Sequence, residues 1–260
     1  MVNRILSFAA LLAMFLVPAS LHAQQAENNP SPPYRGISIH IPGITITPVD
    51  GAPFSATEEV RNEQTLPDGT VDVKRTWTQI GRDTRGRIHD EVRSLVPADF
   101  HGTPRLRVMH LYDPRTRLST YCNPVTLLAQ QHLFLEPEKK ASVSNSQEKI
   151  EDLGTSTING LFVRGTRHIF TVSAKASGTG APVAVTNEYW YSQDLQINVL
   201  IRRTDPRTGT QTVSLADLKR EEPDQSFFEV PEGYKIVDMT PPDGAPVSHD
   251  AMGIGGGITP

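Results

Sequence analysis

The sequence of 260 residues contains a single cysteine, Cys122. An internal disulfide needs two cysteines, so the fold is not a disulfide scaffold, and its stability must come from packing and hydrogen bonds. For Cys122 we expect a buried, inert thiol, with a reactive or intermolecular thiol as the alternative. Long apolar runs are also missing after residue 23, so we expect no stable membrane span in the remainder of the chain.

The short motifs of common active sites are missing as well. The sequence has no G-x-S-x-G elbow, no H-E-x-x-H pair, no phosphate-binding loop, no EF-hand loop and no dinucleotide glycine pattern. His89, Asp90 and Glu91 are adjacent, but neighbours in a strand point to opposite faces, so we interpret them as exposed polar strand residues. We therefore expect no catalytic residue, no metal site, no cofactor and no enzyme, and a hydrolase is the less favoured alternative.

An excess of positive charge is missing too. The formal net charge is −4, and it becomes −5 without residues 1–23, because Arg4 is the only charged residue among them. Nucleic acid and anionic membrane surfaces attract basic proteins, so neither is expected as a partner.

The N-terminal stretch is the clearest positive signal. Arg4 is followed by an apolar run over 5–17 and then by Ala-Ser-Leu-His-Ala, which ends at Ala23. This pattern predicts a signal peptide over 1–23 with cleavage after Ala23. No cysteine lies near that position to accept a lipid, so we expect a soluble exported protein, with the periplasm and the medium both open.

Composition divides the rest of the chain into three parts. Residues 24–36 are rich in Pro, Asn and Gln and predict a flexible leader. Residues 241–260 are rich in Gly and Pro without apolar periodicity and predict a disordered tail. A single β-rich domain is expected over 37–240.

Within that domain the apolar pattern mostly alternates, which is typical of strands. Residues 37–47 predict a strand interrupted at Pro42-Gly43. Turn sequences at 67–69 and 83–86 predict a three-stranded meander, and the repeated Asp-Pro-Arg-Thr at 113–116 and 205–208 predicts two further hairpins.

Helical patterns are scarce. The best candidate is 125–135, which follows Pro124, and shorter helices are expected near Ser214 or Ser226. The charged, Ser-rich segment 136–152 is interpreted as a solvated loop. We therefore predict a mainly β fold: a large curved antiparallel sheet, a half-barrel of about nine to eleven strands, with one or two short helices.

Aromatic and apolar residues on the predicted central strands are the candidate ligand contacts. Alternation sends Tyr189 and Tyr191 to one face and Trp190 to the other, and these rings suit either a packed core or the wall of a binding groove. The candidate binding residues, chosen for size and position, are Trp190, Phe162, Phe170 and Val199.

The stretch from Glu188 to Tyr234 carries a resemblance. It contains E-Y-W-Y-S-x-D-L, then D-P-R-T-G, then R-E-E-P-D-x-S-x-F-E-V-P-E-G-Y. It resembles a group of secreted bacterial proteins of uncharacterised role, and its ending is similar to the periplasmic lipoprotein carriers and the related sigma-E regulator. The resemblance implies a half-barrel that binds a lipid or lipoprotein acyl chain. The alternative is an envelope module that binds another protein and regulates it.

Overall fold

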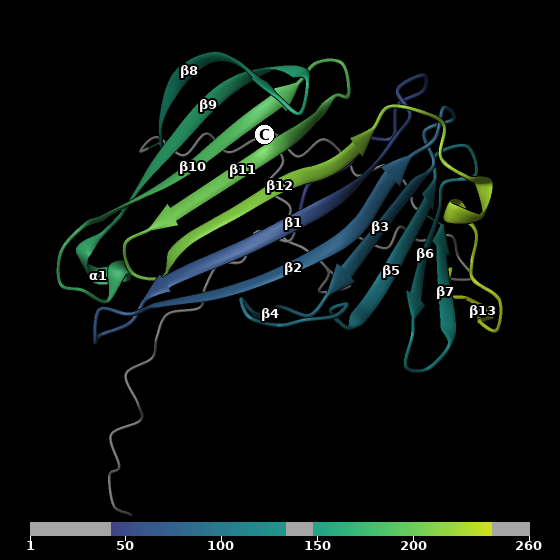
Figure 1. Ribbon diagram of the computed structural model, residues 1–260, viewed down its shortest axis with the longest axis horizontal. Helices are drawn as coiled ribbons and strands as arrows, with labels where there is room; N and C mark the ends of the chain where they lie inside the picture. The colour runs from purple at the N-terminus through teal and green to yellow at the C-terminus, as the bar shows by residue number, and fades with distance from the viewer. Residues whose placement is uncertain (1–42, 134–147, 241–260) are drawn as a thin grey trace, which may run out of the picture. The chain divides into compact units, whose positions relative to one another are not determined.

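The computed structural model describes residues 43–133 and 148–240. Within these ranges the chain forms one open, curved sheet of thirteen strands, shown in Figure 1. No helix in the described ranges is long and apolar enough to cross a membrane. The elements are β1 (Phe54–Thr65), β2 (Val71–Arg82), β3 (Ile88–Arg93), β4 (Val96–Pro97), β5 (Leu106–Asp113), β6 (Leu118–Asn123), β7 (Leu128–Leu133), β8 (Glu148–Ile158), β9 (Leu161–Val172), α1 (Ala174–Ser177), β10 (Val183–Ser192), β11 (Ile197–Asp205), β12 (Gly209–Lys219), the 3₁₀ helix η1 (Gln225–Phe228) and β13 (Lys235–Asp238).

The predicted fold class is confirmed, but the strand count is higher than predicted. The strand order is β13-β7-β6-β5-β3-β2-β1-β12-β11-β10-β9-β8, and β4 pairs with β2 beside this path. All neighbours are antiparallel except β13 and β7. The turn at Asn159-Gly160, where both residues have positive φ, separates β8 from β9. The predicted signal peptide, leader and tail lie outside the described residues.

The predicted hairpins are present, and aspartates close their turns. β1 and β2 pair over their whole length around the 67–69 turn, and β3 continues the meander after the next turn. There Asp83 Oδ1 accepts hydrogen bonds from the backbone N–H groups of Arg85 (2.9 Å) and Arg87 (2.7 Å). The two Asp-Pro-Arg-Thr turns join β5 to β6 and β11 to β12 in the same way, each with its Asp accepting from the Arg two residues later.

The predicted helix at 125–135 is wrong. Leu128–Leu133 form β7, which pairs with β6 and β13, and residues 134 and 135 lie outside the described ranges. Leu127 has a positive φ of 53°, which is incompatible with a helix, and Asn123 Oδ1 accepts from the N–H groups of Val125 and Thr126 to close a turn. Side chains on both faces of β7 are buried, so its apolar residues do not alternate and the periodicity misleads.

Three smaller expectations are also corrected. Ser214 lies in β12 rather than at the start of a helix, whereas Ser226 does lie in η1. Residues 43–47 form no regular strand, although Ile44 and Ile46 are buried. Glu148–Asp152 were assigned to a solvated loop and instead begin β8, where the ladder with β9 orders them.

The two faces of the sheet are covered by different segments. Residues 43–53, here called the strap, pack on the face of the sheet that carries Ala56, Val60 and Ile80. We call this face the strap face. Ile44 and Ile46 of the strap belong to the same hydrophobic cluster as those residues. The whole buried cluster is Ile44, Ile46, Phe54, Ala56, Val60, Ile80, Ile88, Leu161, Val163, Leu195, Ile197, Val199, Ile201, Val213 and Leu215.

Arg82 fastens the strap to the sheet. Its side chain is fully buried, and its guanidinium donates to the carbonyl oxygens of Thr47 (2.5 Å), Ala52 (2.7 Å) and Leu195 (2.8 Å). A planar guanidinium can serve several carbonyls at once, which a lysine cannot do with the same geometry. One buried side chain thus joins the strap, β2 and the loop before β11.

The opposite face is covered by the C-terminal segment. Met109, Leu111, Cys122 and Ala129 form a second cluster, against which Val230 and Tyr234 pack. Cys122 is buried as predicted, and burial raises the pKa of its thiol to about 11, so it is protonated at neutral pH. η1 extends this cover: the ring of Phe227 stacks on His89 at 3.8 Å, and His89 Nδ1 lies 2.6 Å from Phe227 O.

Candidate functional site

Polar side chains from five strands meet on the strap face. We call Glu58, Asp90, His110, Tyr121 and His132 the carboxyl–imidazole patch. The strand register places them on one face. In the ladder, Asp90 lies opposite Ile80 and His110, and His110 lies opposite Tyr121. Glu58 lies opposite Thr78, and His132 lies opposite Ser119.

Glu58 occupies a position that alternation reserves for apolar side chains. It is 3% exposed and lies between Ala56 and Val60 on β1. Its Oε2 accepts a hydrogen bond of 2.5 Å from the N–H of Ile44. Gly43 lets the strap approach this closely: its φ is 148°, and a Cβ there would lie 2.8 Å from Glu58 Oε1. Burial, with a contribution from the charge of Asp90, raises the pKa of Glu58 to about 8, so the carboxyl is neutral at pH 7.

Asp90 is the second displaced carboxyl of the patch. Burial raises its pKa to about 7, with His89 opposing and Glu91 adding to the shift. Its neighbour in sequence behaves in the opposite way: although burial acts against it, hydrogen bonds from His89 and Arg93 lower the pKa of Glu91 to about 2. His89 and Glu91 face the side of η1, whereas Asp90 faces the strap side, as alternation requires. The interpretation of all three as exposed residues is therefore wrong, because both faces of β3 are covered.

Aromatic rings form the other half of the patch. His110 stacks on Tyr121 with ring centroids 4.5 Å apart, and its Nε2 lies 2.7 Å from Ser119 Oγ. His132 meets Tyr121 edge-on at 6.2 Å. Burial, and then the charge of Asp90, raise the pKa of the Tyr121 hydroxyl. The patch thus combines neutral or weakly acidic hydrogen-bonding groups with stacked rings.

Several buried polar atoms on this face have no partner in the described part of the chain. They include Asn62 Oδ1 and, on side chains that are 6%, 3% and 9% exposed, Thr76 Oγ1, Thr78 Oγ1 and His132 Nδ1. Thr78 stands directly opposite Glu58 in the ladder. An unpaired buried polar group costs about 1–3 kcal/mol, so native proteins rarely keep one without a use.

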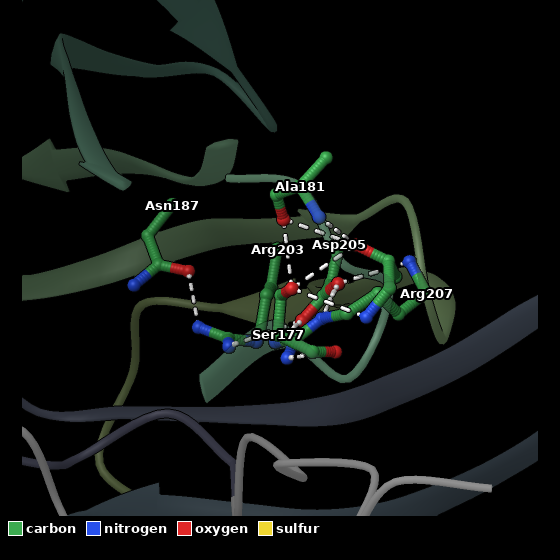
Figure 2. A network of polar contacts seen from close by, with 7 residues as sticks. Ser177, Ala181, Asn187, Arg203, Asp205 and Arg207 are labelled. Atoms are coloured by element: carbon green, nitrogen blue, oxygen red, sulfur yellow. Dashed lines mark hydrogen bonds and ion pairs between the residues drawn. The ribbon is translucent and has the colours of Figure 1, made fainter. Parts of the chain in front are cut away.

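A second polar group on the strap face is structural. Figure 2 shows Arg203 and Arg207 converging on Asp205, with Asn187 on the far side of Arg203. Arg207 donates to both carboxylate oxygens of Asp205 (2.9 and 2.7 Å), and Arg203 Nη1 donates to Asn187 Oδ1 (3.0 Å). The hydrogen bonds from Arg207 lower the pKa of Asp205. Ser177 Oγ donates to the carbonyl oxygen of Ala181, which closes the turn after α1 beside this network.

The structure brings two of the four residues predicted to bind a ligand, Val199 and Trp190, into the same hydrophobic cluster. Val199 is fully buried, and Trp190 packs half-buried against the cluster that contains it. Phe162 is 65% exposed, and Phe170 lies outside both hydrophobic clusters. Their role in binding stays a prediction.

The carboxyl–imidazole patch was missed by sequence reasoning, although one signal pointed to it. In β1 the alternate residues Phe54, Ala56 and Val60 are apolar, and Glu58 interrupts them. The partners of Glu58 come from distant strands, and no sequence spacing reveals them. Within the described ranges, no group of three or more His, Cys, Asp or Glu side chains is placed to hold a metal ion.

Comparison with known proteins gives structural neighbours only. No family model matches the chain, and no curated protein matches it in sequence. Among solved structures, the MucA/MucB complex of Pseudomonas aeruginosa is 12% identical with a TM-score of 0.36, over 68% of this chain and 55% of that chain. The lipoprotein LppX of Mycobacterium tuberculosis is 12% identical with a TM-score of 0.28, over 65% and 88%.

A putative outer membrane lipoprotein-sorting domain from Vibrio parahaemolyticus is 13% identical with a TM-score of 0.18, over 68% of this chain and 89% of that chain. This chain spans 55 to 57% of the length of the matched MucB chains.

Proposed function

We propose that this chain is an exported, non-enzymatic protein that binds a lipid or another acyl-bearing ligand on the strap face of its sheet. The ligand would be amphipathic, with its apolar part along the hydrophobic cluster and its polar head against the carboxyl–imidazole patch. Export rests on the N-terminal pattern that ends at Ala23.

One observation carries the proposal. Thr76, Thr78 and His132 keep buried polar atoms without partners in the described residues, on the same face as the large hydrophobic cluster. A plain core would bury apolar atoms at these positions, and a ligand head with hydrogen-bonding groups would pair them. The apolar cluster alone would serve equally well as a core, so the support for a binding face comes from the unpaired polar atoms.

The test is native mass spectrometry of the protein purified from the exported fraction of its own host, followed by denaturing extraction and lipid analysis. The proposal expects a stoichiometric added mass that extraction releases and identifies as an acyl species. Protein that carries no added mass, and that binds no acyl compound in titration, would contradict it.

An envelope protein partner is the second candidate, and the edge of the sheet favours it. β8 has eleven residues, and among the described strands it pairs with β9 alone, so no described strand lies along its outer edge. Extended segments of other proteins can add to such an edge by backbone hydrogen bonds. A single proline at 155 or 157, placed by mutagenesis, would weaken a partner at this edge and leave acyl binding unchanged.

A further inference from the structure

In the described part of the chain, the two displaced carboxyls of the strap face form no salt bridge with Lys or Arg. Glu58 is faced by Thr78 of β2, Leu215 of β12 and Ile44 of the strap, none of which carries charge. In the described residues, neither Glu58 nor Asp90 forms a salt bridge with any Lys or Arg.

The described groups around Asp90 are imidazoles, a phenol and a carboxylate, with no Lys or Arg in contact with it. Across the ladder Asp90 faces His110, beyond which lie Tyr121 and His132. His89 and Glu91, its chain neighbours, point to the opposite face, where Glu91 pairs with Arg93. Arg82 is the nearest guanidinium along β2 on the strap face, and carbonyl oxygens occupy it. Among the described residues, then, no Lys or Arg is paired with either carboxyl.

The chemistry of the surrounding groups selects a particular cation. A primary ammonium has three N–H donors, and the acceptors here are two carboxyls and the unpartnered hydroxyl of Thr78.

We propose that the carboxyl–imidazole patch binds the ammonium head of an amphipathic amine, whose apolar part lies on the neighbouring hydrophobic cluster. This inference rests on the proposed function and names the chemical class of its ligand. Glu58 and Asp90 neutralise the head, Thr78 accepts one of its hydrogen bonds, and the strap covers it through Ile44.

Proton release is the signature that distinguishes this site from ordinary apolar binding. Glu58 and Asp90 both hold protons more tightly than usual in the free protein. A bound ammonium favours their ionised forms, so the complex forms with loss of protons near pH 7. An uncharged or anionic ligand would release none.

The experiment is calorimetric titration of the exported protein at pH 7 with decylamine hydrochloride and with sodium decanoate, below their micelle concentrations. Repeating each titration in buffers of different ionisation enthalpy counts the protons released. We expect decylamine to bind at least about tenfold more tightly than decanoate and to release about one proton per site. Glu58→Gln should remove most of the preference for decylamine and most of the proton release. Glu59→Gln, at a position whose side chain points to the other face, should change neither quantity.

The outcomes separate the two proposals. Decanoate that binds as tightly as decylamine, or amine binding without proton release, would overturn the amine inference and leave acyl binding in place. Failure of both compounds to bind, together with protein free of added mass after purification from its host, would overturn both. If Glu58→Gln does not fold, Asp90→Asn and the proton count of the unmodified protein still decide the matter.

Discussion

Glu58 is an acid in a place that the strand pattern assigns to an apolar side chain, and its raised pKa makes the stability of the fold depend on pH. An ordinary Glu has a pKa of 4.5, and in the fold Glu58 has a pKa of about 8. Between these values the folded protein keeps a proton that the unfolded chain has lost. The free energy of unfolding therefore falls as pH rises from 4.5 to 8, by up to about 1.4 kcal/mol per pH unit, and then levels off.

Glu58→Gln should flatten this part of the pH profile. The amide keeps an acceptor for the N–H of Ile44 and has no charge to bury. Denaturant unfolding of the unmodified protein and the variant at pH 5, 6, 7 and 8 measures the slope. Ionisation of Asp90 also lowers the free energy of unfolding as pH rises to about 7, so the variant keeps part of the pH dependence. A slope that Glu58→Gln leaves unchanged would show that this carboxyl is ionised in the fold.

Thr78 offers a test with opposite effects on stability and on binding. Its hydroxyl has no partner in the described residues, so Thr78→Val keeps the shape and removes an unpaired polar atom. Thermal unfolding should show the ligand-free variant to be more stable by about 1 kcal/mol. Binding of the co-purified species should be weaker by about 1 kcal/mol or more, as measured by calorimetry. A variant that binds normally would place the hydroxyl outside the site.

Gly165 leaves room for the indole ring of Trp190, one of the four residues that the sequence predicts to bind a ligand. A Cβ at Gly165 would lie 2.8 Å from Trp190 Cζ3 and 2.9 Å from Leu153 Cβ. Gly165→Ala should therefore lower the free energy of unfolding by about 1–3 kcal/mol through overpacking, measured by denaturant titration. Adding Trp190→Leu should recover part of the loss. A neutral Gly165→Ala would mean that the indole ring shifts freely and is not held against the cluster.

At the scale of elements, the C-terminal segment covers the face opposite the strap face. The accessibility of the buried Cys122 thiol therefore measures how firmly that segment is packed. Tyr234 packs on the cluster that contains this buried thiol. Tyr234→Ala should raise the labelling rate of Cys122 by a thiol-reactive disulfide reagent about tenfold or more, because local opening becomes easier. Tyr191→Ala, on β10, is the control and should leave the rate unchanged. Equal rates in all three proteins would mean that another segment protects the thiol.

The sequence predicts those elements whose signals are local. Asp-Gly and Asp-Pro pairs place turns by their own backbone preferences, which is why the hairpins at 67–69, 113–116 and 205–208 were found. β7 was mistaken for a helix because its residues are buried on both faces by distant segments. The carboxyl–imidazole patch was missed for the same reason: the neighbours of Glu58 and Asp90 come from strands that only the register brings together.

At the scale of the whole described sheet, each face has its own cover. The strap lies on the face with the large hydrophobic cluster, and the C-terminal segment lies on the face with Cys122. The two covers differ in kind. The C-terminal side combines apolar and aromatic packing with the His89–Glu91 pair, in which Glu91 is also bound by Arg93, whereas the strap side buries two carboxyls that have no Lys or Arg partner in the described residues and two unpaired threonine hydroxyls. This difference is why we assign binding to the strap face.

The most direct test of that assignment is a methyl NMR spectrum of the protein as purified from its host and again after extraction and refolding. Our account predicts that removal of the bound species shifts the methyl signals of Thr76, Thr78 and Val60, while those of Met109 and Leu111 on the opposite face stay in place. Shifts confined to the opposite face or to β8, with the three strap-face methyls unmoved, would contradict it.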